Sequence, residues 1–225
     1  MGGASEAAPF GMPVHDQHVW AHLIADQLEG RWGSSSGFRW NAEAWAGTDT
    51  DRVWLKSEGL LAQSGLLEEG RHELLYARPV TSFFDAQLGL RMDADSRAGR
   101  GWAAFGIEGL APLFLHVSAT GYVSGGGRLA ARLEGSYDLL LTQRLILQPR
   151  LELNFYSRPD PSRLIGTGLA DLETGLRLRY EISRKFAPYI GLSYENRFAG
   201  SAALSRLAGE HTAQMQFVAG LRLWY

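Results

Sequence analysis

Cysteine is absent from the sequence, which excludes disulfide bonds, thiolate metal sites and thiol catalysis together. No run of about 18 apolar residues occurs either, so no transmembrane helix is expected. The net charge of −2 lacks the strong positive field of nucleic-acid-binding proteins, and no nucleic-acid partner is expected. The first ten residues, MGGASEAAPF, lack the basic and apolar regions of a signal peptide. The chain is therefore either cytoplasmic or a mature form whose signal has been removed.

What the sequence does contain is alternation. The stretch RLILQPRLELNFY (144–156) places leucines and a phenylalanine on one parity and charged or amide side chains on the other. Successive side chains of a strand point to opposite faces, so this pattern predicts a long strand with one apolar and one polar face.

The same period of two recurs along the whole chain, and the first and fourth segments break phase as β-bulges do. Twelve strands are predicted, over residues 19–32, 37–46, 52–61, 70–79, 83–93, 101–109, 113–123, 128–141, 144–156, 168–181, 186–198 and 213–225.

The connections between these strands favour a membrane barrel. Short turns are expected near 47–51, 80–82, 110–112, 142–143 and 182–185, and several of the other connections are longer. Strands of about ten residues with short turns at one end and longer loops at the other are typical of outer-membrane barrels. The fold class predicted is all-β: a transmembrane, antiparallel, up-and-down β-barrel of 12 strands with a polar, charged lumen. Both termini and the short turns are expected at the periplasmic end.

A soluble sandwich or lipocalin-like barrel is the alternative. The strands are longer than the five or six residues usual in soluble proteins, and aromatic residues collect near strand ends as interfacial girdles do. These are Phe83, Phe84, Trp102, Phe155, Phe186, Tyr189, Phe198, Trp224 and Tyr225. The chain also stops on GLRLWY, an alternating strand that ends in an aromatic residue. These features favour the membrane barrel, with the leucines of 144–156 facing lipid.

On this phasing the lumen holds both signs of charge on neighbouring strands, which predicts ion pairs and a narrow or plugged interior rather than a wide channel. The lumenal charges predicted are Arg39, Glu43, Arg52, Lys56, Glu58, Arg91, Glu108, Arg128, Arg132, Glu134, Asp138, Arg150, Glu152, Asp171, Glu173, Arg177, Arg179, Glu181, Glu195, Arg197 and Arg222.

A group of soft ligands lies where the N-terminal tail enters the first strand. Met12, His15, His18 and His22 are close in sequence there, and imidazole suits copper and zinc while thioether selects Cu(I). The spacing fits no closed metal motif, and a histidine-rich tail without a metal is the alternative. This group is the first candidate metal site.

His116 is the second candidate ligand, because it lies on the polar phase of its strand with Ser118 and Thr120. The first and seventh strands are opposite in a ring of twelve, so His22 and His116 are not expected to share a metal unless the tail folds inside. Met92 and Met215 fall on the outward phase and are predicted to face lipid.

An enzyme is not favoured. The candidates are His116 with Ser118 and His72 with Glu73, and neither pair has an identifiable third group to orient it. His72 and His211 lie at expected loop borders and carry no clear signal.

Four segments of the sequence resemble the copper resistance protein B family of Gram-negative outer membranes, and the likeness extends from about residue 15 to the C-terminus. These are DRVWLKSEG (51–59), YDLLLTQRLILQPRLELNFY (137–156), GLADLETGLRLRYEISRKFAPYIGL (168–192) and FVAGLRLWY (217–225). The resemblance implies an outer-membrane barrel that works with periplasmic copper-resistance proteins in copper sequestration or export. The family often carries a Met/His-rich N-terminal region, whereas residues 1–18 here hold only Met1, Met12, His15 and His18.

The combined expectation is a short periplasmic tail over 1–18 and an outer-membrane barrel over 19–225. Its predicted function is copper binding, with sequestration or export of copper from the periplasm. The predicted copper ligands are Met12, His15, His18, His22 and His116, with outer-membrane lipid as the surroundings. A barrel hydrolase of lipase or protease type and a passive structural barrel are the alternatives.

Overall fold

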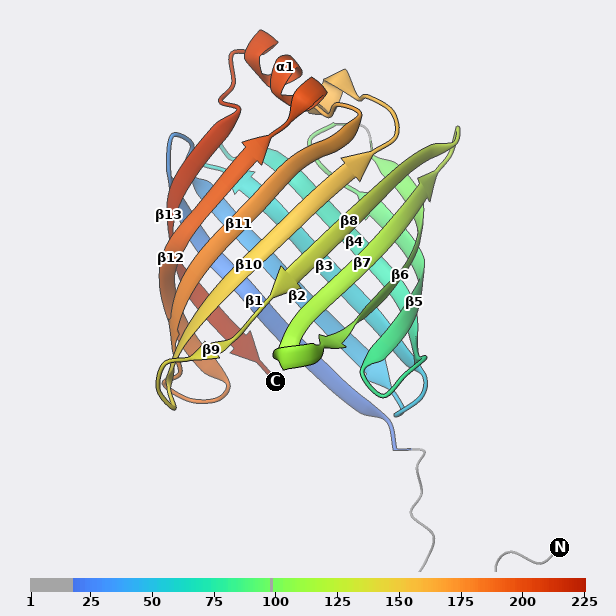
Figure 1. Cartoon of the computed structure of the whole chain (residues 1–225), viewed down its shortest axis with the longest axis vertical. Coiled ribbons are helices and arrows are strands. Elements are labelled where there is room, and N and C mark those ends of the chain that lie inside the picture. The colour runs from blue at the N-terminus through green and yellow to red at the C-terminus, as the bar shows by residue number, and fades with distance from the viewer. Residues whose placement is uncertain (1–17, 98) are drawn as a thin grey trace, which may run out of the picture.

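The computed structural model describes residues 18–97 and 99–225, and most of them form β-strands (Figure 1). The elements are β1 (Trp20–Gly33), β2 (Gly37–Gly47), β3 (Arg52–Ala62), β4 (Leu67–Pro79), β5 (Phe84–Asp93), β6 (Arg100–Ala111), η2 (Pro112–Phe114), β7 (Leu115–Ser124), β8 (Arg128–Ser136), β9 (Leu139–Leu140), β10 (Leu145–Tyr156), η3 (Pro161–Arg163), β11 (Gly168–Tyr180), β12 (Phe186–Arg197), α1 (Ala199–Leu207) and β13 (Ala213–Trp224). In the described residues, no helix is long and apolar enough to cross a membrane.

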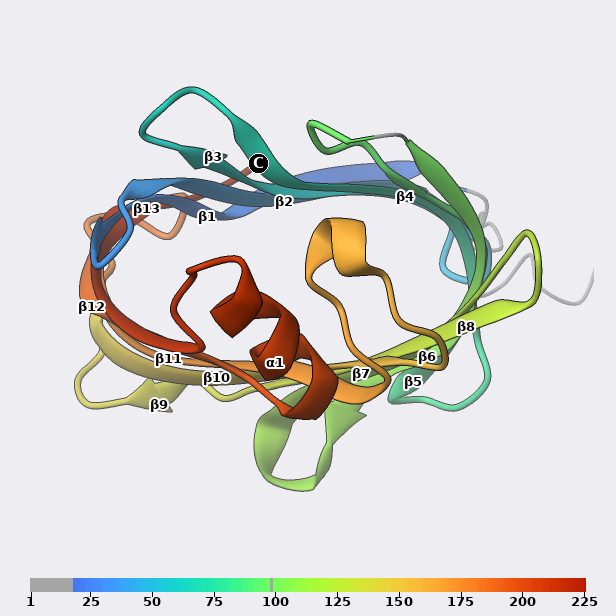
Figure 2. The same ribbon diagram turned by 90° about the horizontal axis from the view of Figure 1, so that it is seen from above.

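The strands form one closed antiparallel ring. Strands that are neighbours in sequence pair with each other, except that β8 and β9 both pair with β10. Because β1 pairs with β13 and β10 with β11, the sheet has no open end (Figure 2). The sheet contains 13 strands, and β8 with β9 corresponds to a single predicted strand, which makes 12 around the ring. The prediction of a closed 12-strand antiparallel barrel is confirmed.

One predicted strand, 128–141, is interrupted between β8 and β9, and the cause is a proline on the facing strand. The Tyr137 N–H donates to the carbonyl of Pro149 at 3.1 Å, but Pro149 has no N–H to return to Tyr137. The ladder therefore loses one bond there and resumes where Leu140 faces Ile146.

The two ends of the barrel differ. The turn end carries the short connections at 48–51, 80–83, 112–114, 141–144 and 181–185, together with the start of β1 and the C-terminus (Figure 1). The loop end carries 157–167, which contains η3, and 198–212, which contains α1, and both fold over the opening when seen from above (Figure 2). In outer-membrane barrels short turns face the periplasm and longer loops face the exterior, so the turn end is assigned to the periplasmic side.

Two bulges shift the phase of the strands. In β1 the register slips between Ala25 and Gln27, as the broken alternation of the first segment predicts, so His22 before the slip and Glu29 after it both face the lumen. In β4 the slip falls between Leu67 and Glu69, opposite Leu60 and Leu61, and the register is unbroken over 71–79, so the bulge predicted within 70–79 was wrong. Since a bulge adds one residue, it reverses which side chains face inward beyond it.

The two faces of the wall have the expected polarity. Leu151 and Leu176 are 41% and 45% exposed on the outer face, and Met92 and Met215 are exposed there as predicted. Three members of the aromatic girdle were predicted wrongly: Trp102 and Tyr189 are buried in the lumen, and the Trp224 ring faces His22 there. Trp102 donates to Asp93 and Tyr189 to Glu29, so the polar end of each of these two rings is satisfied inside.

Candidate metal centre at the turn end of the lumen

The middle of the lumen is filled by ion pairs, as the mixed charges of the inward phase predict. Arg132 is one centre: its Nη2 donates to Glu58 and to Glu152, each at 2.8 Å, and its Nε contacts Glu134. Arg150 also reaches Glu134, at 3.4 Å. Residues from three strands, β3 on one side of the ring and β8 and β10 on the other, are thereby joined across the interior.

Glu29 is the second centre and is fully buried, with 0% exposure. It accepts two bonds of 2.9 Å from Arg177, one of 2.9 Å from Arg31 and one of 3.0 Å from Tyr189. A buried carboxylate is stable only with such partners, because an unpaired charge there would lose its hydration without compensation. The sequence phasing missed Glu29 and Arg31, since the β1 bulge that turns them inward has no unique position in the sequence.

The loop end is held by a second kind of contact, here called the loop-end clasp: Asp95, Arg100, Arg128, Asp160 and Arg163. Arg163 donates to Asp95 at 2.8 and 3.0 Å, and Asp160 is contacted by Arg100, Arg163 and Arg128. Burial raises the pKa of Asp160, but hydrogen bonds from Ser162 and Arg100 and the nearby guanidinium charges outweigh burial and lower it to about 2. The carboxylate stays charged, so the clasp ties the η3 segment to β6 and β8.

The helix α1 is fastened to the same region by hydroxyl groups. The Gly166 N–H donates to Ser201 Oγ at 2.7 Å, and Arg197 donates to Ser205 Oγ at 2.8 Å. Both serines are buried, and α1 lies beside the η3 segment over the barrel opening (Figure 2). The loop end is therefore covered by two segments that are bonded to the wall and to each other.

The turn end has a different lining, here called the aromatic mouth: Trp20, His22, Trp45, Trp54 and Trp224. The His22 ring lies 5.3 Å from the Trp224 ring and 6.1 Å from the Trp45 ring, measured between centroids. Trp45 lies 6.0 Å from Trp54 in the same way. Four neighbouring strands, β13, β1, β2 and β3, thus present aromatic rings to the lumen at one level of the wall.

The predicted copper ligands fall at this end where the structure describes them. His18 precedes β1 and packs on Trp20 with ring centroids 4.5 Å apart, and His22 is partly buried in the aromatic mouth. His116 is exposed near the start of β7, at the same end of the barrel but on the far side of the ring. Met12 and His15 lie outside the described residues, as does the predicted tail apart from His18.

The described residues show no group of three or more His, Asp or Glu side chains placed to hold one metal ion. Among the described candidate ligands, His22 is the one that lies between two indole rings, Trp45 and Trp224. The Arg52 guanidinium is 5.4 Å from the Trp45 ring. A complete site would therefore need a further donor from the tail or from a partner. The ligand set proposed from the sequence is left untested by this geometry.

The candidate catalytic pairs are not supported. His72 and Glu73 lie on opposite faces of β4: His72 points outward, where its Nδ1 is 3.1 Å from Ser57 Oγ, while Glu73 faces the lumen and accepts from Tyr122. The placing of His72 at a loop border was wrong, because β4 begins at Leu67 and continues through it. His116 and Ser118 share the lumenal face, and in the described part of the chain no third group orients them.

Comparison with known proteins decides the family. The family model described as copper resistance protein B precursor matches residues 19–225. The copper resistance protein B of Escherichia coli is 45% identical over 216 residues, which cover 96% of this chain and 73% of that protein. The copper resistance protein B homolog of Pseudomonas syringae pv. tomato is 44% identical over 218 residues, with the same coverage of 96% and 73%. The chain belongs to the copper resistance protein B family.

Solved structures place this family member among outer-membrane barrels. The NanC porin has a TM-score of 0.56 at 12% identity, covering 91% of this chain and 99% of that one. The KdgM porin has a TM-score of 0.52 at 11% identity, covering 90% and 98%. At such identities the likeness concerns the fold, and the chain is an outer-membrane β-barrel.

Proposed function

We propose that this barrel binds copper at the periplasmic mouth of its lumen and removes the ion from the periplasm by holding it there. The observation that carries the proposal is the position of His22, an imidazole fixed between Trp45 and Trp224 at the turn end. Imidazole is a good copper ligand, and Met12 and His15 would add the donors that the described residues lack. Membership of the copper resistance protein B family supports copper as the cargo.

Sequestration is favoured over free passage by the contents of the lumen. Glu29 and Arg31 are 0% and 1% exposed although they face the interior, so this part of the lumen is occluded by side chains. The clasp and α1 cover the other opening. Export through the barrel would require the ion pairs and the covering loops to move apart, whereas binding at the turn end requires neither.

The partners proposed are periplasmic copper-resistance proteins, which would deliver copper at the turn end. His116 is then a second stop, reached from the same opening. The hydrolase alternative has less support, because His72 is separated from Glu73 and no orienting acid accompanies His116 in the described residues.

The test is copper binding by a purified variant in which His15, His18 and His22 are replaced by alanine. Copper affinity is expected to fall more than tenfold, about 1.4 kcal/mol or more, while the barrel still folds. His211→Ala is the matched control, since His211 is exposed at the loop end and should leave affinity unchanged. Unaltered affinity in the triple variant and in His116→Ala would overturn the proposal that histidines at the turn end capture copper.

A further inference from the structure

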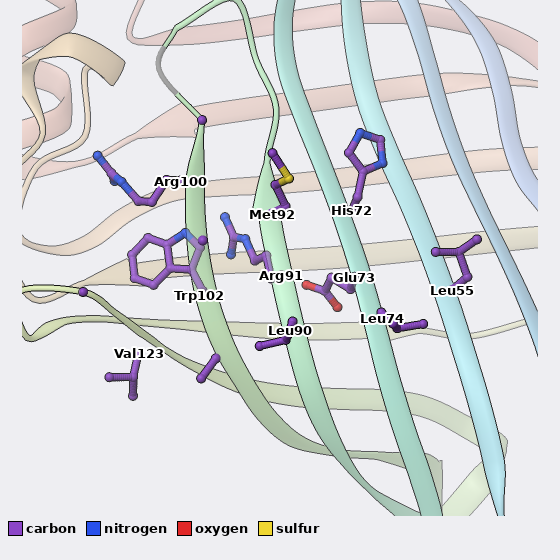
Figure 3. A pocket seen from close by; sticks show the side chains of 14 residues that line it. Leu55, His72, Glu73, Leu74, Leu90, Arg91, Met92, Arg100, Trp102 and Val123 are labelled. Atoms are coloured by element: carbon purple, nitrogen blue, oxygen red, sulfur yellow. The ribbon is translucent and has the colours of Figure 1, made fainter.

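The outer face of the wall carries a hollow of about 640 Å³ near the loop end, here called the outer hollow. Its floor is formed by the small residues Gly101 and Ala103 of β6. A Cβ at Gly101 would meet nothing within 4 Å. Larger outward side chains surround this floor, and Figure 3 shows Met92 beside His72 with Leu55, Leu74 and Leu90 lower in the view; Val123 completes the rim.

The position of the outer hollow places it in the outer leaflet. Its floor and upper rim come from the loop-end halves of β5 to β7: Met92 is one residue from the end of β5, and Gly101 is the second residue of β6. Its lower rim reaches the middle of the wall, at Leu74 of β4 and Leu55 of β3. Longer loops of outer-membrane barrels face the exterior, so this part of the wall meets the outer half of the bilayer. An apolar depression at that depth fits a hydrocarbon chain.

Glu73, Arg91, Arg100 and Trp102 also border the hollow, but Glu73, Arg91 and Trp102 turn their side chains into the lumen and Arg100 pairs with Asp160. Of the lining side chains that point outward, His72 is the polar one. The Trp40 indole N–H donates to Ser57 Oγ at 3.1 Å, and Ser57 Oγ lies 3.1 Å from His72 Nδ1. When the Ser57 hydroxyl donates to Nδ1, the imidazole carries its proton on Nε2 and offers one N–H at the rim of the hollow. A lipid ester or phosphate oxygen would accept this bond, whereas a bare hydrocarbon chain could not.

Arginines stand above the hollow at the loop end. Arg158 is exposed and donates to the carbonyl of Gly126, the residue after Gly125 on the rim. Arg97 lies two residues before Gly99, which also lines the hollow. Its Nη1 is 3.8 Å from Asp95, whose shorter bonds of 2.8 and 3.0 Å go to Arg163. Positive charge is thus available to an anionic headgroup directly above the apolar outer hollow.

We propose that the outer hollow is a binding site for lipid A, the phosphorylated, multiply acylated glycolipid of the outer leaflet. One acyl chain lies over Gly101 and Ala103, the phosphate is held by Arg158 with Arg97, and His72 donates to an oxygen between the two. The combination of anionic phosphate and acyl chain is what the arginines above and the apolar floor below complement. This site is independent of the copper proposal.

The test is retention of lipid A by the purified, folded barrel, measured by native mass spectrometry from detergent. Ala103→Phe fills the hollow, and Ala86→Phe is the matched control, because Ala86 also faces outward but near the turn end of β5. Retention is expected to fall about tenfold in Ala103→Phe, since excluding about two methylene groups of the chain removes a factor of that size. Arg158→Ala is expected to weaken retention about fivefold, as one cation near a charged lipid surface contributes about that factor.

Two results would overturn the proposal. Equal retention in Ala103→Phe and Ala86→Phe would show that the acyl chain does not use the hollow. Phosphatidylglycerol bound as tightly as lipid A would show that any anionic lipid suffices. If Ala103→Phe fails to fold, as judged by loss of the heat-modifiable gel shift, Gly101→Leu replaces it because open space surrounds that position.

Discussion

The inward-facing side chains differ between the two ends of the lumen. At the loop end, Asp95 and Asp160 bind arginines from several segments and close the opening with charge. At the turn end, His22 and its neighbouring tryptophans form a lining of aromatic rings, with the ion pairs Arg52–Asp85 and Arg222–Asp26 nearby. Charge pairs cross-link and exclude, whereas an imidazole among indoles leaves a ligand accessible to a soft cation. The difference supports the proposed capture of copper at the turn end, with the loop end closed.

The largest loss of stability is expected from a substitution between these ends, where the ion pairs fill the lumen. Arg132→Ala leaves Glu58, Glu134 and Glu152 without their common cation, so unfolding free energy should fall by about 3–5 kcal/mol. Urea titration of the barrel refolded in lipid vesicles measures this. Arg158→Ala, which removes an exposed loop arginine, should change stability by less than about 0.5 kcal/mol. A similar small change for Arg132 would mean that the network is not what holds the lumen together.

The next largest loss of stability is expected where an arginine is placed on the lipid face of the wall rather than on its lumenal face. Leu176→Arg or Leu151→Arg should cost about 2–4 kcal/mol if these residues lie near the bilayer midplane. Ser136→Arg, on the lumenal phase, should avoid that lipid-transfer cost, although it must fit beside neighbouring side chains. Folding in vesicles would separate the faces, and equal losses at all three positions would contradict their assignment.

The smallest effect concerns the loop-end clasp. Asp160→Asn removes the charge that Arg100 and Arg128 share, and stability should fall by about 1–2 kcal/mol, because Asp160 is buried and its bonds to guanidinium groups are charge-assisted. The pKa of Asp160 lies at about 2, below its ordinary value of 3.8, so its contribution is present above pH 3.8 and is lost as pH falls through about 2. Pepsin should therefore cleave 157–167 slowly at pH 4 and faster near pH 2. In Asp160→Asn this pH dependence should disappear, and its persistence would point to another group.

The fold could be predicted from the sequence because every strand has one face toward lipid and one toward the polar lumen. Apolar and polar residues therefore alternate along each strand. Residues 144–156 show the alternation directly, and β10 spans Leu145–Tyr156. What could not be predicted are features that depend on contacts between strands. The β1 bulge reverses the phase of Glu29 and Arg31, and Pro149 interrupts a strand that is not its own.

The candidate site was predicted only in part for the same reason. His18, His22 and His116 could be assigned to one end of the barrel from their strand positions. The ring partners of His22 could not, because Trp45 and Trp224 come from strands paired through a register that the sequence does not state. Trp224 had been placed in the lipid girdle on its position at a strand end, whereas its ring contacts His22 in the lumen.

The most direct test of the account is a copper anomalous difference map from crystals of the full chain soaked in copper. The account predicts a peak beside the His22 imidazole at the turn end, with a second and weaker one at His116. A map whose copper lies only at the loop end, among Asp95, Asp160 and their arginines, would contradict it, as would a map with no ordered copper at either histidine.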